Sequence, residues 1–243
     1  MRAPGAQSFT PYGATECLPG ASSGSDEILN ETRHRTDAGA GVCVGRTVQG
    51  LTAKIIRISD DPIETWSDAL ELPAGEIGEI VVRAAHATRA YFNLPAATAL
   101  SKIRGAAEGD VYHRMGDVGY FDGSGRLWFC GRKTHRVVTR QQTRFSIPCE
   151  GVFNAHPRVF RSALVGVRRN GITEPVLCVE LEVGASSGSL ETIRKELRRL
   201  GAGHAHTRDI YTILFHPAFP VDVRHNAKIF REKLALWAAG QLR

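Results

Sequence analysis

The residue pattern of this chain changes near Arg132, and this change limits its fold more than any other feature. Before Arg132, short runs of alternating apolar and polar residues are separated by turns rich in Gly, Pro and Asp, as is typical of β-strands. Residues 17–44 are rich in Ser, Gly and Thr and predict a long surface connection with at most one short helical turn. After Arg132, strand-like runs alternate with helical patterns. The sequence therefore predicts an α+β chain, with a β-rich part over residues 1–131 and a small α+β part over residues 132–243.

The strands of the first part are predicted from alternation and from turn chemistry. Leu51–Ser59 and Gly78–Arg83 each alternate well enough for a strand. Val118–Phe121 and Leu127–Cys130 flank an Asp-Gly-Ser-Gly sequence, which is a strong signal for a hairpin. We therefore expect antiparallel strands in this part.

The second part contains both the two-residue alternation of strands and the 3.6-residue period of helices. Ser162–Val167, Val176–Leu181 and Tyr211–Phe215 are predicted strands. Leu190–Leu200 is a predicted amphipathic helix, and Ile229–Leu242 a helix that offers apolar side chains, including Leu236, to a core. We expect this part to fold as a separate small domain.

Composition excludes several classes of protein. The 243 residues are 42% apolar, but the longest apolar runs are far shorter than the roughly 18 to 20 residues of a membrane span. The start of the chain fits neither a secretory signal nor a transit peptide, so we expect a cytoplasmic protein. The net charge of +6 is interleaved with acids, and no nucleic-acid surface is predicted. The five cysteines form no C-x-x-C pair, so we expect reduced thiols and no metal site of His or Cys.

Three short motifs and one lysine carry the candidate chemistry. They are Tyr12–Glu16 (Tyr-Gly-Ala-Thr-Glu), His113–Asp117 (His-Arg-Met-Gly-Asp), Gly131-Arg132, and Lys228 in an Asn-Ala-Lys-Ile run. Singly, each also fits a turn or a solvated surface residue. Together they supply what ATP-driven activation of a carboxylate needs, namely a magnesium ligand, a hydrogen-bond acceptor for ribose and a cation for the developing negative charge.

In this order and spacing, the motifs resemble those of the adenylate-forming superfamily of acyl-CoA synthetases, adenylation domains and luciferases. The resemblance covers essentially the whole chain. It implies that the aromatic ring of Tyr12 packs on adenine, that Thr15 meets phosphate and that Glu16 binds Mg²⁺. It also implies that Asp117 holds the ribose hydroxyls and that Arg132 reaches the nucleotide. The full set implied for binding ATP is Tyr12, Gly13, Thr15, Asp117 and Arg132.

The same resemblance assigns the two predicted parts to two domains. Residues 1–131 would be the C-terminal, β-rich part of the large AMP-binding domain, and residues 132–243 the small mobile lid domain. Lys228 on the lid would contact the reacting carboxylate and phosphate, and residues 132–134 would be the hinge. The implied catalytic residues are Lys228, Thr15 and Glu16.

Within the superfamily, the runs around Gly131, Cys149 and Lys228 resemble the β-lactone synthetases of bacterial olefin biosynthesis. The implied reaction activates a long-chain 2-alkyl-3-hydroxy fatty acid as acyl-AMP, after which the 3-hydroxyl attacks the carbonyl and closes a β-lactone. Gln141–Phe145 replaces the usual Gly-aromatic-Arg loop of a pantetheine tunnel, which weakens a reading as a fatty acyl-CoA ligase that uses CoA. That ligase and a non-catalytic, partner-binding remnant are the alternatives. Association with other enzymes of olefin biosynthesis is left open.

The chain contains neither a Ser/Thr/Gly-rich phosphate loop ending in Pro-Lys nor a Walker loop. Members of the superfamily are longer, and the resemblance implies that this chain corresponds to their C-terminal half. Loss of charge-assisted phosphate contacts weakens ATP binding by orders of magnitude. We therefore expect that the chain does not catalyse adenylation by itself.

Overall fold

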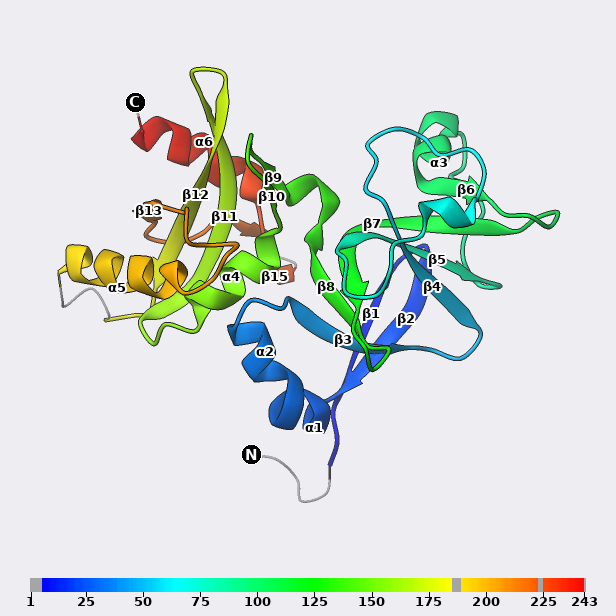
Figure 1. Cartoon of the computed structure of the whole chain (residues 1–243), viewed down its shortest axis with the longest axis horizontal. Helices are drawn as coiled ribbons and strands as arrows, with labels where there is room; N and C mark the ends of the chain where they lie inside the picture. Colours follow the sequence, from blue (N-terminus) through cyan, green and yellow to red (C-terminus); the bar gives the residue numbers. More distant parts are fainter. Residues whose placement is uncertain (1–5, 185–188, 223–224, 243) are drawn as a thin grey trace. The chain divides into compact units, whose positions relative to one another are not determined.

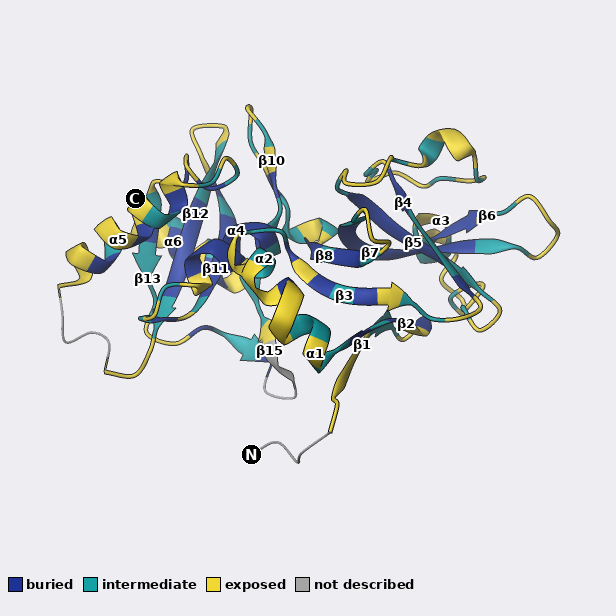
Figure 2. Ribbon diagram, turned by 60° about the horizontal axis from the view of Figure 1, so that its bottom comes forward, coloured by how far each residue is buried: buried dark blue, intermediate teal, exposed yellow. Residues whose placement is uncertain are grey.

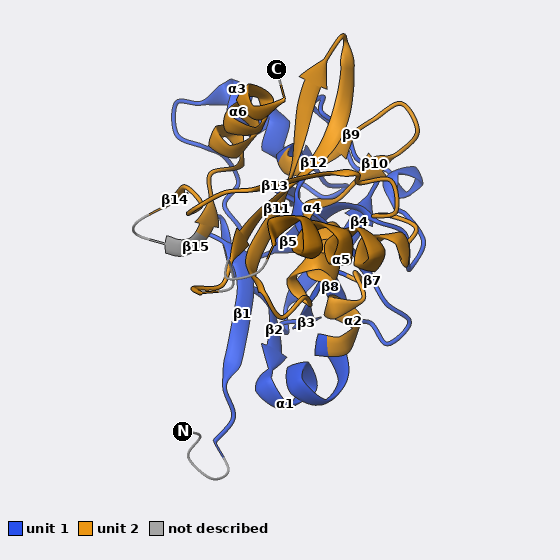
Figure 3. Ribbon diagram, turned by 90° about the vertical axis from the view of Figure 1, so that its left-hand side faces the viewer, with its two compact units in different colours: residues 1–33, 41–134 blue, residues 34–40, 135–243 orange. Residues whose placement is uncertain are grey.

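The computed structural model describes residues 6–184, 189–222 and 225–242 (Figure 1). The chain forms two compact units. Unit 1 contains residues 1–33 and 41–134, and unit 2 contains residues 34–40 and 135–243 (Figure 3). Both strands and helices are present, and the predicted α+β class is confirmed. The roles of the two parts as a large-domain remnant and a lid stay predictions.

Unit 1 is built on one eight-stranded sheet. Seven of its strands follow the order β1-β2-β3-β8-β7-β5-β4, and the eighth, β6, pairs with β7. All of its pairings are antiparallel. The strands are β1 (Phe9–Ala14), β2 (Cys17–Gly24), β3 (Val42–Thr47), β4 (Leu51–Ile56), β5 (Gly78–Ala84), β6 (Lys102–Arg104), β7 (Val111–Phe121) and β8 (Leu127–Arg132). A short helix, α3 (Pro95–Ser101), precedes β6.

The core of unit 1 lies on both faces of its central strands. Ile80 and Val82 of β5 belong to one buried cluster, whereas Val81 belongs to another. Successive side chains of a strand point to opposite faces, so β5 is buried on both sides. The predicted β7–β8 hairpin is confirmed, and Asp122 stabilises its turn by accepting hydrogen bonds from the backbone N–H groups of Ser124 and Arg126, both at 3.0 Å.

The prediction for residues 17–44 was wrong. Cys17–Gly24 forms β2, and a helical segment follows, consisting of α1 (Ser25–Glu27), a π-helical turn (Ile28–Thr32) and α2 (Arg33–Asp37). Strand β3 approaches β2 so closely that Gly45 of β3 must lack a Cβ, because a Cβ there would come 1.8 Å from the carbonyl oxygen of Ser22. Pairing with neighbours thus overrides the weak strand propensity of Ser and Gly.

Unit 2 is a three-stranded sheet with helices on both faces. Strand β12 (Ile172–Leu181) pairs antiparallel with β11 (Val159–Arg169) and parallel with β13 (Thr212–Phe215). The helices are α4 (Ser146–Asn154), α5 (Leu190–Ala202) and α6 (Arg231–Gln241). Two short hairpins are formed by β9 (Val137–Val138) with β10 (Thr143–Arg144), and by β14 (Val221–Asp222) with β15 (His225–Ile229).

Alternation along the strands of unit 2 decides which helix covers which face. Leu164 packs in a cluster with residues of α4 and α5, whereas its neighbours Ala163 and Val165 pack with Leu234 of α6. Figure 2 shows the buried residues concentrated in β11 and β12. The predicted strands and helices of this unit are confirmed to within a few residues. Leu236, expected in the core, is 77% exposed, because it lies on the face of α6 opposite Leu234.

None of the helices in the described parts of the chain combines the length and the apolar character that a membrane crossing needs.

Candidate active site

Three of the predicted site residues meet in unit 1. Asp117 and Arg132 are direct partners in the β7–β8 ladder, and Nη1 of Arg132 donates to Oδ1 of Asp117 at 2.7 Å. The hydroxyl of Tyr12, from β1, donates to Oδ2 of the same carboxylate at 2.7 Å. Asp117 is buried, whereas the side chain of Arg132 is 54% exposed. The result is a fixed carboxylate with a cation and an aromatic ring beside it.

Two glycines shape the backbone at this carboxylate. Gly116 has a φ of 68° and Gly131 a φ of 119°, a range that favours glycine over residues with a Cβ. Each directly precedes a site residue, Asp117 in one case and Arg132 in the other. The glycines of the two motifs are therefore needed by the backbone that presents these side chains.

Burial and the Asp117 carboxylate raise the pKa of Tyr12 well above its usual value, and the charge of Arg132 only partly opposes this. An ionised tyrosine next to a carboxylate would place two like charges together. Tyr12 therefore stays protonated and acts as a hydrogen-bond donor at neutral pH.

Glu16 and Thr15 lie in the turn that joins β1 to β2. The hydroxyl of Tyr91 donates to Oε1 of Glu16 at 2.7 Å, and this bond lowers the pKa of Glu16 although partial burial acts against it. Thr15 is exposed. Gly13, predicted to bind nucleotide, has a packing role in this hairpin, since a Cβ there would come 2.8 Å from the carbonyl oxygen of Cys17. The turn thus presents an ionised carboxylate next to a hydroxyl.

Glu16 fits Mg²⁺ only as a single carboxylate ligand. Among the described residues, no group of three or more His, Cys, Asp or Glu side chains could hold a metal ion. Mg²⁺ is commonly held by one or two carboxylates together with the phosphates of a substrate. Glu16 is therefore suited to a metal ion that arrives with a nucleotide.

Lys228 belongs to unit 2, whereas all other predicted site residues belong to unit 1. It lies on β15 and its side chain is exposed. This exposure leaves its ammonium group accessible to a ligand.

Sequence reasoning missed a buried ion cluster in unit 1. Glu79 of β5 is fully buried and receives two hydrogen bonds from Arg114, at 3.0 and 2.7 Å. Nζ of Lys133, next to Arg132, lies 3.2 Å from the same carboxylate and donates to the carbonyl oxygen of Ser59 at 2.7 Å. A signal was present, because Arg114 and Glu79 are charged residues inside strand patterns. The cluster fixes β5, β7 and the end of β8.

His113 gives unit 1 a pH-dependent stability. It is buried, its Nδ1 lies 3.2 Å from the carbonyl oxygen of Ser101, and burial together with the charge of Lys102 lowers its pKa to about 4. The imidazole of His113 binds a proton more readily in the unfolded chain than in the folded one. The contribution of neutral His113 to the free energy of unfolding is therefore complete above about pH 6.5 and is lost as the pH falls to about 4. The loss is about 3 kcal/mol.

This prediction is checked by urea unfolding of the wild type and of His113→Gln at pH 7, 5.5 and 4. We expect the difference between their unfolding free energies to shrink by about 3 kcal/mol over that range. A difference that is constant with pH, or an NMR titration of His113 near 6.5, would contradict it.

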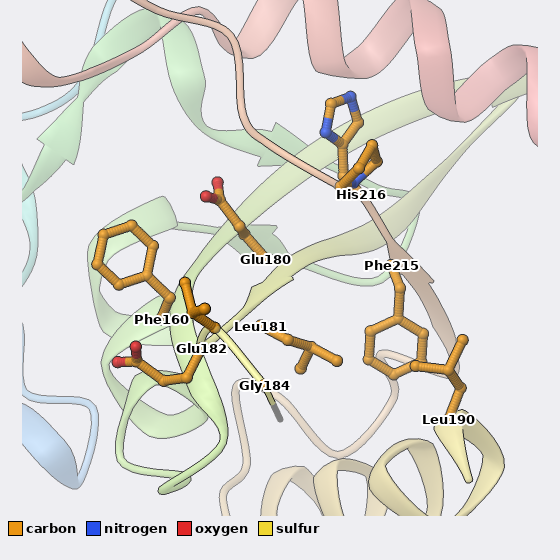
Figure 4. A pocket seen from close by; sticks show the side chains of 10 residues that line it. Phe160, Glu180, Leu181, Glu182, Gly184, Leu190, Phe215 and His216 are labelled. Atoms are coloured by element: carbon orange, nitrogen blue, oxygen red, sulfur yellow. The ribbon is translucent and has the colours of Figure 1, made fainter. Parts of the chain in front are cut away.

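Unit 2 has a surface pocket of about 530 Å³ at the ends of β12 and β13 (Figure 4). Phe160, Leu190 and Phe215 give it apolar walls, and the carboxylate of Glu180 lies at its edge. That carboxylate already accepts hydrogen bonds from Nε of Arg161 at 2.8 Å and from the backbone N–H of Phe219 at 2.7 Å. An acidic edge repels phosphate, and none of the predicted site residues lines the pocket. The candidate nucleotide site is therefore the one in unit 1.

Comparison with solved structures shows which known proteins share this fold. No family model matches the chain. Among solved structures, an amide bond synthetase from Marinactinospora thermotolerans has a TM-score of 0.74 at 24% identity, over 94% of this chain and 42% of that one. ATP-bound MatB from Rhodopseudomonas palustris has a TM-score of 0.71 at 20% identity, over 97% of this chain and 41% of that one. Both likenesses concern the fold.

Sequence similarity is stronger. The olefin β-lactone synthetase of Xanthomonas campestris is 53% identical over 239 residues, which are 97% of this chain and 43% of that protein. The chain is therefore similar to proteins of the adenylate-forming superfamily. Within it, the chain is similar to olefin β-lactone synthetases, and it spans about two fifths of the length of these curated relatives.

Proposed function

We propose that this chain provides the ribose-binding and metal-binding residues of an olefin β-lactone synthetase, together with its catalytic lysine. The observation that carries the proposal is the Asp117 carboxylate held between Arg132 and Tyr12, in a chain 53% identical to such an enzyme. Superfamily proteins bind ATP, as the ATP-bound neighbour does. ATP is therefore the proposed nucleotide.

The ribose of ATP would bind at Asp117. Its hydroxyl groups would donate to this carboxylate, beside the hydroxyl of Tyr12 or in exchange for it. The exposed guanidinium of Arg132 would stay next to the nucleotide, and the Tyr12 ring would be available to pack on adenine. This arrangement selects a nucleotide by its sugar and its base.

The phosphates would bind near the β1–β2 turn. Glu16 would hold Mg²⁺, which supplies charge stabilisation of the phosphates, and the hydroxyl of Thr15 would donate to a phosphate oxygen. Lys228 from unit 2 would supply the cation that meets the charge developing on the carboxylate and the α-phosphate. Each unit thus brings one part of the adenylation chemistry.

The second step would be ring closure by the substrate's own 3-hydroxyl group. Intramolecular attack has a high effective concentration, which helps to offset the strain of a four-membered ring. Arg144, in the segment that replaces the pantetheine loop, is buried and pairs with Asp209 at 3.5 Å, so little of its side chain is exposed for contact with CoA. This favours a β-lactone over the acyl-CoA of the alternative ligase. A long-chain β-hydroxy acid is therefore the proposed substrate, with other enzymes of olefin biosynthesis as candidates for association, and the cytoplasmic location stays a prediction.

Replacing Asp117 by Asn tests the nucleotide site. Charge-assisted hydrogen bonds contribute about 1.5–3 kcal/mol each, so we expect ATP to bind about 10–100-fold more weakly. Calorimetric titration of the chain with ATP and Mg²⁺ measures this. Asp68→Asn is the matched control, since Asp68 is exposed and its carboxylate accepts a hydrogen bond from the indole N–H of Trp66, far from the predicted site residues in the sequence. Equal ATP affinity of the wild type and Asp117→Asn would show that Asp117 does not bind the ribose.

A further inference from the structure

Glu16 is held by a segment that no motif of the sequence marked. His86 Nε2 lies 3.5 Å from Sγ of Cys17, and the backbone N–H of Thr88 donates to the carbonyl oxygen of Glu16 at 2.9 Å. The hydroxyl of Tyr91 then donates to the Glu16 side chain at 2.7 Å. Residues 86–91 therefore run along the β1–β2 turn and contact it at three successive points.

This segment is itself fixed to the sheet and to α3. The backbone N–H of Tyr91 donates to Oγ1 of Thr98 at 3.0 Å. Nζ of Lys102 donates to the carbonyl oxygen and the hydroxyl of Thr88, and it lies 5.5 Å from the centre of the Tyr91 ring. Lys102 is 7% exposed and pairs with His113 in the β6–β7 ladder. A buried, bonded lysine of this kind holds the segment firmly, so the position of the Tyr91 hydroxyl is defined.

The bond from Tyr91 engages one oxygen of the Glu16 carboxylate. This oxygen is Oε1, which leaves Oε2 outside the contact with Tyr91. Carboxylates that bind metals are usually oriented by hydrogen bonds to neighbouring groups, and loss of such a partner typically weakens metal binding about 10–100-fold. Tyr91 has the geometry of such a partner.

We propose that Tyr91 is a positioning residue that orients Glu16 so that its second oxygen, Oε2, binds a divalent cation. Lys102 and Thr98 anchor residues 86–91 and so fix the position of the Tyr91 hydroxyl next to the β1–β2 turn. This inference rests on the proposed metal role of Glu16.

The test uses Mn²⁺ as a paramagnetic probe on the whole chain in the presence of AMP-PNP. Broadening of the amide signal of Glu16 during a Mn²⁺ titration gives an apparent dissociation constant. Tyr91→Phe removes only the hydroxyl, and we expect the dissociation constant to rise about ten-fold. AMP affinity without metal and the thermal unfolding midpoint should stay unchanged. Tyr211→Phe, the same change at an exposed residue of unit 2, is the matched control and should have no effect.

A double-mutant cycle separates this inference from the proposed function. Glu16→Gln should weaken Mn²⁺ binding, and adding Tyr91→Phe to it should have no further effect. If Glu16→Gln weakens binding but Tyr91→Phe does not, or if Tyr91→Phe acts equally in both backgrounds, the positioning role is overturned while the metal role of Glu16 stands. If Glu16→Gln itself leaves Mn²⁺ binding unchanged, the metal role and the positioning role are both overturned.

Discussion

In the chain joined to an N-terminal half that supplies the phosphate loop, replacing Lys228 by Ala is expected to lower the rate of acyl-adenylate formation by about 10²–10³-fold, the usual cost of removing one preorganised electrostatic donor. Lys228 lies on β15 of unit 2, whereas the residues assigned to ribose and metal lie in unit 1. The substitution should therefore leave ATP affinity unchanged while the chemical step slows. Single-turnover formation of acyl-AMP, measured beside equilibrium ATP binding, separates the two quantities.

Lys233→Ala is the matched control for this prediction. Lys233 is a nearby lysine of α6 whose Nζ lies over the ring of Phe230 at 4.7 Å, and it has no proposed role in catalysis. Its replacement should leave the rate unchanged. An unchanged rate for Lys228→Ala as well would remove the lysine from the mechanism, and a loss of ATP affinity would mean that it binds the ground state.

Replacing Glu79 by Gln should lower the free energy of unfolding of the chain by about 3–5 kcal/mol, because breaking a buried ion pair leaves its partner's charge uncompensated. Glu79 is fully buried, and both Arg114 and Lys133 depend on its carboxylate. Urea unfolding followed by circular dichroism measures this change.

Glu71→Gln provides the contrast. Glu71 pairs with Lys54 at 2.8 Å, but both side chains are 35% exposed, so we expect its loss to cost less than about 1 kcal/mol. If the two substitutions lowered the free energy of unfolding by similar amounts, burial would not govern how much these ion pairs contribute to stability. That result would contradict the stabilising role given to the Glu79 cluster.

Much of the fold was predictable because its signals are local. The β7–β8 hairpin follows from its Asp-Gly-Ser-Gly turn, and α5 (Leu190–Ala202) follows from its 3.6-residue periodicity. Strand β2 was not predictable, because Ser and Gly favour strands weakly and only pairing with β1 and β3 makes them extended. Leu236 was misplaced because the apolar pattern of α6 does not mark one face clearly.

The candidate site was likewise predictable only in part from the sequence. The motifs pointed to Tyr12, Asp117 and Arg132, and the structure joins all three by hydrogen bonds although Tyr12 is 105 residues from Asp117. What the motifs could not give is the contact between Tyr91 and Glu16, since a tyrosine in a loop carries no signal of its partner. Such contacts arise from tertiary packing, which one sequence without its structure does not encode locally.

The central claim is that the chain serves ATP-dependent formation of a β-lactone, and a mass-resolved product assay tests it most directly. The chain alone, and the chain joined to any in-frame coding sequence upstream of Met1, would receive ATP, Mg²⁺, CoA and a 2-alkyl-3-hydroxy fatty acid. We predict β-lactone and AMP from the joined form, with no acyl-CoA. Acyl-CoA as the product, or no ATP-dependent product from either form, would contradict the account.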